Sequence, residues 1–183
     1  MPKQLMLIVM LTAAVGSATL EAKELVLSPA RVAAIVSPVD ARDTRVLAYF
    51  ELPEALKSGT ATIVNAALEF DAGIEGAEFG MAYVFPVTKD WQSASSIAWD
   101  SPWSSLGGDY TMEIAGKSVA LKSAKGQGRV RSNVTFIVMD WIAGRLPNNG
   151  LVIMPSQEDL QESATAFSLD KGNMNLKINY EEK

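Results

Sequence analysis

The sequence predicts an all-β fold, an antiparallel sandwich or barrel with one short helix. Short β-rich runs follow one another at intervals of about 8 to 20 residues and are separated by Gly, Pro, Ser and Asp, as in such folds. A single segment, residues 133–144, instead repeats its apolar residues at helical spacing. With 183 residues, 48% of them hydrophobic, the chain can bury a sizeable core, and we expect one domain over residues 23–183.

The expected strands come in chain order and end at Gly, Pro or polar turns. In residues 45–53, Val46 and Ala48 lie on one face and Leu47 and Tyr49 on the other, so this strand is predicted to be buried on both sides. The last part of residues 117–130 is a Gly-rich turn. The β-rich runs are residues 24–28, 31–37, 45–53, 62–72, 79–87, 110–116, 117–130, 150–155, 164–169 and 175–180.

The helix is expected from about Val134 to Ala143. Ser132 or Asn133 can cap its start, and Gly144 suits its end. Apolar side chains surround it almost completely, so we expect it to plug the sandwich rather than lie on its surface. These apolar residues are Val134, Phe136, Ile137, Val138, Met139, Trp141 and Ile142.

Residues 1–18 have the features of an export signal. Lys3 precedes an apolar run over residues 5–15, and small residues follow, so we expect cleavage after Ala18 or, as second choice, after Ala22. The run is much shorter than the roughly 20 residues that span a bilayer. We therefore expect a secreted or periplasmic protein with no stable membrane insertion after signal removal.

The composition excludes several function classes. The chain has no cysteine and no histidine, which removes disulfides, Cys/His zinc sites, thiol nucleophiles and Ser-His-Asp catalysis. Its formal net charge of -5 argues against nucleic acid as a partner, because phosphate binding needs Lys and Arg over a whole face.

Four segments, taken in order, resemble a DNRLRE domain, also described as carbohydrate-binding module family 96. They are "VLAYFELPEALKSGTATIVNAALEF", "VFPVTKDWQSASSIAWDSPWSSLGGDY", "VTFIVMDWIAGRLPNNGLVIMP" and "ATAFSLDKGNMNLKINYE". The positions that match the family pattern are Phe50, Ala67, Leu68, Trp91, Trp99, Pro102, Trp141, Gly144, Asn149, Gly150, Leu176 and Tyr180. Departures are Glu51 for the family's Asp, Ala98 for its Thr, and Asn173 or Met174 for its Pro.

The resemblance implies a jelly-roll-like β-sandwich that is secreted and binds an extracellular polysaccharide without catalysis. The polymer is either neutral or acidic. No cofactor is expected, although calcium could bind backbone carbonyls around Asp100 or Asp109.

The Trp-rich stretch of residues 90–110 supplies the aromatic candidates for stacking on a sugar ring. Trp103 lies in a Ser/Gly-rich loop and is the best candidate for an exposed ring, followed by Tyr110, although a structural role is the leading interpretation of each tryptophan. Trp91 and Trp99 are expected to be core or loop-anchoring residues, with their indole N–H groups bonded to the backbone.

A run of cations without any acid forms the second candidate surface. It is either a solvated edge strand and turn or a docking strip for a polyanionic glycan. Its members are Lys117, Lys122, Lys125, Arg129 and Arg131, and Arg42, Arg45 and Arg145 could join it.

Two other function classes stay open. An enzyme would have to use carboxylates such as Asp100, Asp109, Asp140 or Asp170, but their spacing singles out no pair, so we expect no catalytic activity. A structural or matrix protein of the cell envelope, binding protein partners, would also fit an exported module without catalytic groups.

Overall fold

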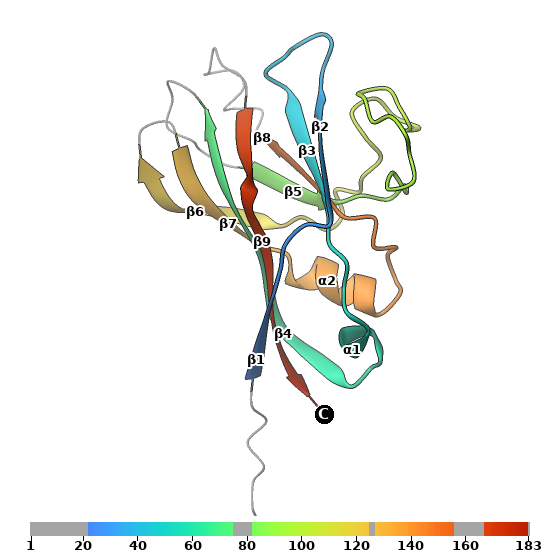
Figure 1. Ribbon diagram of the computed structural model, residues 1–183, viewed down its shortest axis with the longest axis vertical. Coiled ribbons are helices and arrows are strands. Elements are labelled where there is room, and N and C mark those ends of the chain that lie inside the picture. The colour runs from blue at the N-terminus through green and yellow to red at the C-terminus, as the bar shows by residue number, and fades with distance from the viewer. Residues whose placement is uncertain (1–21, 75–81, 125–126, 156–166, 183) are drawn as a thin grey trace, which may run out of the picture.

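The computed structural model describes residues 22–74, 82–124, 127–155 and 167–182. They form two antiparallel sheets that pack face to face (Figure 1), which confirms the all-β sandwich. The five-stranded sheet has the order β1 (Ala22–Leu27), β9 (Phe167–Glu182), β4 (Ala61–Ile74), β7 (Gln127–Asn133) and β6 (Lys117–Ala124). The four-stranded sheet has the order β2 (Arg31–Val36), β3 (Thr44–Tyr49), β8 (Leu151–Pro155) and β5 (Ala82–Pro86).

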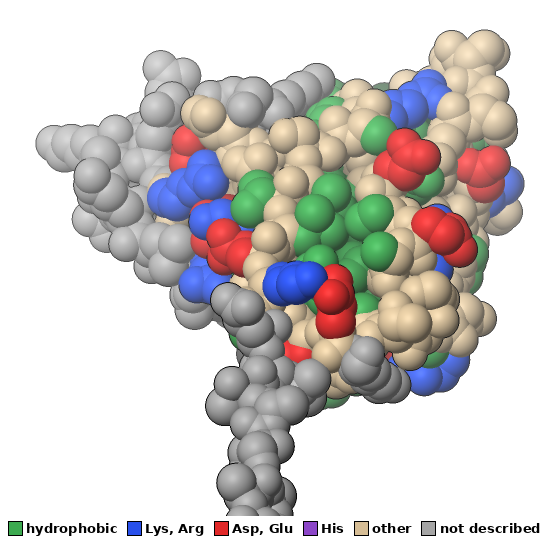
Figure 2. Space-filling view, turned by 60° about the horizontal axis from the view of Figure 1, so that its bottom comes forward, with side chains coloured by type: hydrophobic (Ala, Val, Ile, Leu, Met, Phe, Trp, Pro, Cys, Tyr) green, Lys and Arg blue, Asp and Glu red, His purple; other side chains and the backbone are tan. Residues whose placement is uncertain are grey.

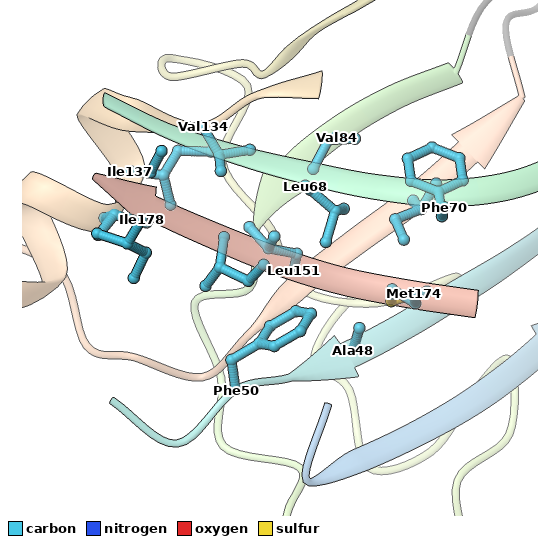
Figure 3. Close-up of a cluster of buried hydrophobic side chains, with 14 of the residues drawn as sticks. Ala48, Phe50, Leu68, Phe70, Val84, Val134, Ile137, Leu151, Met174 and Ile178 are labelled. Atoms are coloured by element: carbon cyan, nitrogen blue, oxygen red, sulfur yellow. The ribbon is translucent and has the colours of Figure 1, made fainter. Parts of the chain in front are cut away.

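The main hydrophobic core lies between the two sheets, because alternate residues of each strand point inward. Leu68 and Phe70 of β4 and Ile178 of β9 enter it from the five-stranded sheet, and Ala48 and Leu151 enter it from the four-stranded sheet (Figure 3). All five side chains are fully buried.

A second hydrophobic layer covers the other face of the four-stranded sheet. Leu47 of β3, Phe85 of β5 and Val152 of β8 point away from the main core and form a buried cluster with Trp91 and Trp103. The loop between β5 and β6, yellow-green in Figure 1, provides this cover. In β3, Val46 and Ala48 thus face the main core and Leu47 faces the second layer, as the apolar alternation predicts, but the strand ends at Tyr49 rather than at residue 53.

The expected helix is confirmed as α2 (Thr135–Ile142), but its burial is less complete than predicted. The N-cap position is Val134 rather than Ser132 or Asn133, although Asn133 accepts a hydrogen bond from the Thr135 N–H at 3.0 Å. Gly144 follows the helix with a φ of +68°. Trp141 is buried in the core, whereas Phe136 is 73% exposed. The helix thus closes one end of the sandwich with one face in water. The structure also contains a second short helix, α1 (Glu54–Lys57), where the sequence predicted only one helix.

Some strand predictions are wrong in detail. Residues 110–116 form only isolated bridges at their two ends, Tyr110 to Val87 and Gly116 to Val84. Residues 117–130 contain two strands, β6 and β7, rather than one. The last two predicted runs belong to one strand, β9, because the 14-residue β4 pairs with it along nearly its whole length across two bulges. The export signal and residues 164–166 lie outside the described residues, and none of the described helices is long and apolar enough to cross a membrane.

Candidate functional site

Two arginines from the four-stranded sheet hold the Trp-rich loop, residues 90–110 of the connection between β5 and β6, in place. Arg31 of β2 donates hydrogen bonds to the carbonyls of Trp91, Gln92 and Ala94, the last at 3.0 Å. Its guanidinium also lies 5.3 Å from the centre of the Trp91 ring. Since β2 is part of the sheet, this arginine fixes the start of the loop against a rigid element.

Arg45 of β3 holds the end of the same loop. It pairs with Asp43 at 3.2 Å, donates to the Gly107 carbonyl at 2.8 Å and lies 4.5 Å from the centre of the Trp99 ring. Gly107 has a φ of +81°, and a Cβ there would come within 2.5 Å of the Arg45 guanidinium. The glycine is therefore needed both for the turn and for the close approach of the arginine.

The expectation that Trp103 presents an exposed ring is wrong. Trp103 is only 8% exposed, belongs to the second hydrophobic layer and donates its indole N–H to the Ala98 carbonyl at 2.8 Å. Trp91 is fully buried and donates to the Asn149 carbonyl at 2.7 Å, which confirms its anchoring role. Trp99 is half-buried under Arg45. The rings are thus the inner surface of the loop and attach it to the sheet.

An open pocket of about 560 Å³ adjoins this loop. Two segments line it, the residues just after β5 and the Ser/Gly-rich part of the loop. The lining residues are Thr88, Lys89, Ser104, Ser105, Leu106, Gly108, Asp109, Tyr110 and Met112.

Asp109 organises the polar wall of the pocket. Its carboxylate accepts the backbone N–H groups of Ser104 at 2.7 Å and Ser105 at 2.9 Å, and Lys89 lies 4.0 Å away. Partial burial raises the pKa of this carboxyl, but the two backbone hydrogen bonds and the Lys89 charge outweigh that effect and hold the pKa below its ordinary value. Asp109 is therefore ionised at neutral pH.

Tyr110 is the aromatic residue of the pocket, and other groups cover much of its ring. The Tyr110 ring stacks on the Phe85 ring with 5.5 Å between their centres. The Arg45 guanidinium lies 5.6 Å from the centre of the Tyr110 ring. Phe85 in turn stacks on Tyr83 at 6.0 Å. Sequence reasoning missed Tyr83, although its alternation with Phe85 in β5 was a signal that both share one face.

Arg129 and Arg131 of the predicted cationic strip lie on the outer face of the five-stranded sheet, because they alternate along β7 with the buried Val130 and Ser132. Lys122 lies opposite Arg129, and Lys117 lies opposite Asn133, two positions along β7 from Arg131. The side chains of Lys117 and Lys122 lie outside the description, so only their backbone pairing with β7 is described. Lys177 of β9 adds a cation that the sequence did not reveal, and Lys125 lies outside the described residues.

The neighbouring strand β4 supplies acids to this strip. Arg129 pairs with Asp71 at 3.1 Å and with Glu69 at 3.5 Å, and Lys177 pairs with Glu69 at 3.0 Å. Arg131 pairs more loosely, with 3.9 Å between its Nε and a Glu69 carboxylate oxygen, and its side chain is more exposed than that of Arg129. Burial raises the pKa of Glu69, but its bonds to Lys177 and Arg129 outweigh burial and lower the pKa. The cations are thus partly neutralised.

The other arginines proposed for the strip are bound elsewhere. Arg42 pairs with Asp40 at 2.7 Å, and Arg45 is held under the Trp-rich loop. Arg145 pairs with Asp140 at the end of α2, with 2.6 Å between Nε and the carboxylate. These three residues therefore do not extend the strip.

The carboxylates considered for catalysis or calcium do not converge in the described part of the chain. Asp109 binds backbone N–H groups, Asp140 binds Arg145, Asp100 is exposed, and the side chain of Asp170 lies outside the description. No group of three or more acidic side chains suited to a metal ion occurs among the described residues.

No family model matches the chain, and no curated protein is significantly similar to it. The resemblance to DNRLRE domains therefore stays a prediction from the sequence.

Proposed function

We propose that this protein is a non-catalytic carbohydrate-binding protein that holds an extracellular polysaccharide in the pocket on the Trp-rich loop. The observation that carries the proposal is the composition of this open pocket. It combines apolar surface with charged and hydroxyl groups in a volume typical of small-molecule sites, about 300–1,000 Å³.

Each wall of the pocket matches one part of a sugar. The Lys89 ammonium can donate to hydroxyls, and the ionised Asp109 carboxylate can accept from them. Leu106 and Met112, each 72% exposed, present apolar surface to the C–H face of a pyranose. These two side chains, together with the open part of Tyr110, replace the buried Trp103 as the apolar contact.

The pocket proposal is tested by affinity electrophoresis and calorimetry with neutral and acidic polysaccharides. We expect Lys89→Met to weaken binding of the retained polymer about tenfold, the loss of one charged hydrogen bond. Lys57→Met is the matched control, because Lys57 is an exposed lysine on α1. Equal affinity of Lys89→Met and wild type, or no retention by any polysaccharide in the panel, would contradict the proposal.

An acidic polymer would have a second place to bind, the outer face of the five-stranded sheet. Arg131 and Lys177 are its accessible cations among the residues with described side chains. If this face takes part, Arg131→Glu weakens binding of an acidic polysaccharide and reduces its salt dependence, while binding of a neutral polymer is unchanged. If Arg131→Glu binds the acidic polymer like wild type, this face is excluded.

The alternative function is a structural protein of the cell envelope. It is supported by the side of the sandwich at which the edge strands β1 and β2 lie. β1 and β2 follow each other in the chain and are the edge strands of the two sheets on that side. Figure 2 shows hydrophobic side chains gathered in one patch with charged side chains around it. Concentration-dependent assembly in light scattering, without glycan retention, would favour this function.

Export is also part of the proposal. Intact mass of the protein recovered outside the cytoplasm should show cleavage after Ala18 or Ala22. An uncleaved chain in the cytoplasm would contradict it.

A further inference from the structure

We infer that Tyr83 is a second stacking position, and that the ligand is therefore a chain of several sugars that runs from the pocket along β5. The inference rests on the proposed function and specifies in addition that the protein recognises several consecutive sugars of the polymer rather than one.

Tyr83 is the accessible end of a stack of aromatic rings. It is 41% exposed, whereas Phe85 is 7% exposed and Tyr110 is half-buried. The planes of Tyr83 and Phe85 lie 20° apart, and those of Phe85 and Tyr110 lie 21° apart, so the three rings stack in sequence. One buried ring thus connects the exposed tyrosine to the tyrosine of the pocket.

The backbone gives the same continuity. Tyr83 and Phe85 share one face of β5, and the strand leads directly into Thr88 and Lys89 of the pocket wall. Hydrogen bonds from Thr88 N–H to the Asp109 carbonyl at 2.9 Å, and from Thr111 N–H to the Pro86 carbonyl at 3.2 Å, join the strand to the other wall. The distance between Tyr83 and the pocket is therefore fixed by regular structure.

A single exposed tyrosine is ordinary on a protein surface, but the setting of Tyr83 is specific. It lies opposite the buried Met154 on β8 and against Phe85, so its ring is held before any ligand arrives. Tyrosine has few rotatable bonds, and a ring already held loses little conformational entropy on binding. A held, half-exposed ring beside a polar pocket suits the apolar face of a second sugar.

The only other aromatic ring among the exposed large hydrophobics of the described residues is Phe136, on α2. α2 closes the end of the main core and is absent from the lining of the pocket. Phe136 is therefore a matched control for loss of an exposed ring.

The test measures affinity against chain length for an oligosaccharide series cut from the polysaccharide that wild type retains. We expect wild-type affinity to rise until the chain reaches both positions. Tyr83→Ala should lower affinity for long oligomers about tenfold and leave the shortest bound oligomer unchanged, while Tyr83→Phe and Phe136→Ala should match wild type at every length.

The outcomes separate this inference from the proposed function. If Tyr83→Ala binds long oligomers like wild type while Lys89→Met loses them, the pocket stands and the second position is wrong. If Tyr83→Ala weakens the shortest oligomer as much as the longest, Tyr83 acts through the pocket and the inference is also wrong. If wild type binds no member of any series, the proposed function and the inference both fail.

Discussion

Replacing Arg45 by methionine should loosen the Trp-rich loop and destabilise the whole domain. The substitution removes a charged hydrogen bond to the Gly107 carbonyl, worth about 1.5–3 kcal/mol, and a cation–π contact with Trp99, worth about 0.5–2 kcal/mol. It also leaves Asp43 without its partner in a half-buried position. Allowing for recovered contacts of the methionine, we expect a loss of about 2–4 kcal/mol in the free energy of unfolding.

The assay is urea denaturation followed by tryptophan fluorescence, with near-ultraviolet circular dichroism of the folded variant. Arg42→Met is the matched control, because Arg42, in the connection just before β3, also pairs with an aspartate two residues earlier but is far more exposed. We expect the control to keep the wild-type midpoint and spectrum. Equal stability of the two variants, or an unchanged near-ultraviolet signal in Arg45→Met, would refute the view that Arg45 fastens the loop to the sheet.

Two further predictions concern the five-stranded sheet. Gly116→Ala should destabilise by about 1–3 kcal/mol, because the new Cβ would lie 2.6 Å from the buried Ser132 Oγ. Measured against Ser132→Ala alone, the double variant should lose less stability in urea denaturation, although Val134 Cγ1 at 3.1 Å and the Asn133 carbonyl at 3.2 Å still crowd the new Cβ. An equal loss in both backgrounds would contradict this cause. Glu69→Gln should make the melting temperature fall less steeply as the pH is lowered. The pKa of Glu69 is lowered in the folded state, so ionised Glu69 contributes fully to stability above the ordinary carboxyl pKa. This contribution is lost as the pH falls through the folded-state pKa. Parallel wild-type and variant curves of melting temperature against pH would exclude that contribution.

Local pattern was sufficient where the neighbours in sequence determine the structure. The alternation in residues 45–53 predicted a strand with two buried faces, and the spacing of apolar residues predicted α2 almost to its ends. Both features depend on the fixed periods of strands and helices. What covers the second face of β3 could not be predicted, because the Trp-rich loop is contributed by a distant part of the chain.

The basic run shows the same limit for charge. Within residues 117–131 no acid accompanies the cations, so the sequence suggested a free cationic strip. Antiparallel pairing places β4 beside β7, and this brings Asp71 opposite Arg129 and Glu69 opposite Arg131. Partners 58 and 60 positions away from Arg129 in sequence thus determine how much of its charge is available to a ligand.

The burial of Trp103 moves the proposed binding surface from the tryptophan rings to the pocket. An exposed tryptophan on a Ser/Gly-rich loop would have to be ordered by the ligand, at a cost in conformational entropy. Here Trp91 and Trp103 pack against the sheet, and Arg31 and Arg45 donate hydrogen bonds to carbonyls near the two ends of the loop. The pocket beside the loop is consequently preorganised although it lies outside the regular strands. Under the proposed function, its placed polar groups select the ligand through hydrogen bonds, and Leu106, Met112 and the exposed Tyr83 supply the apolar contacts that the buried Trp103 cannot.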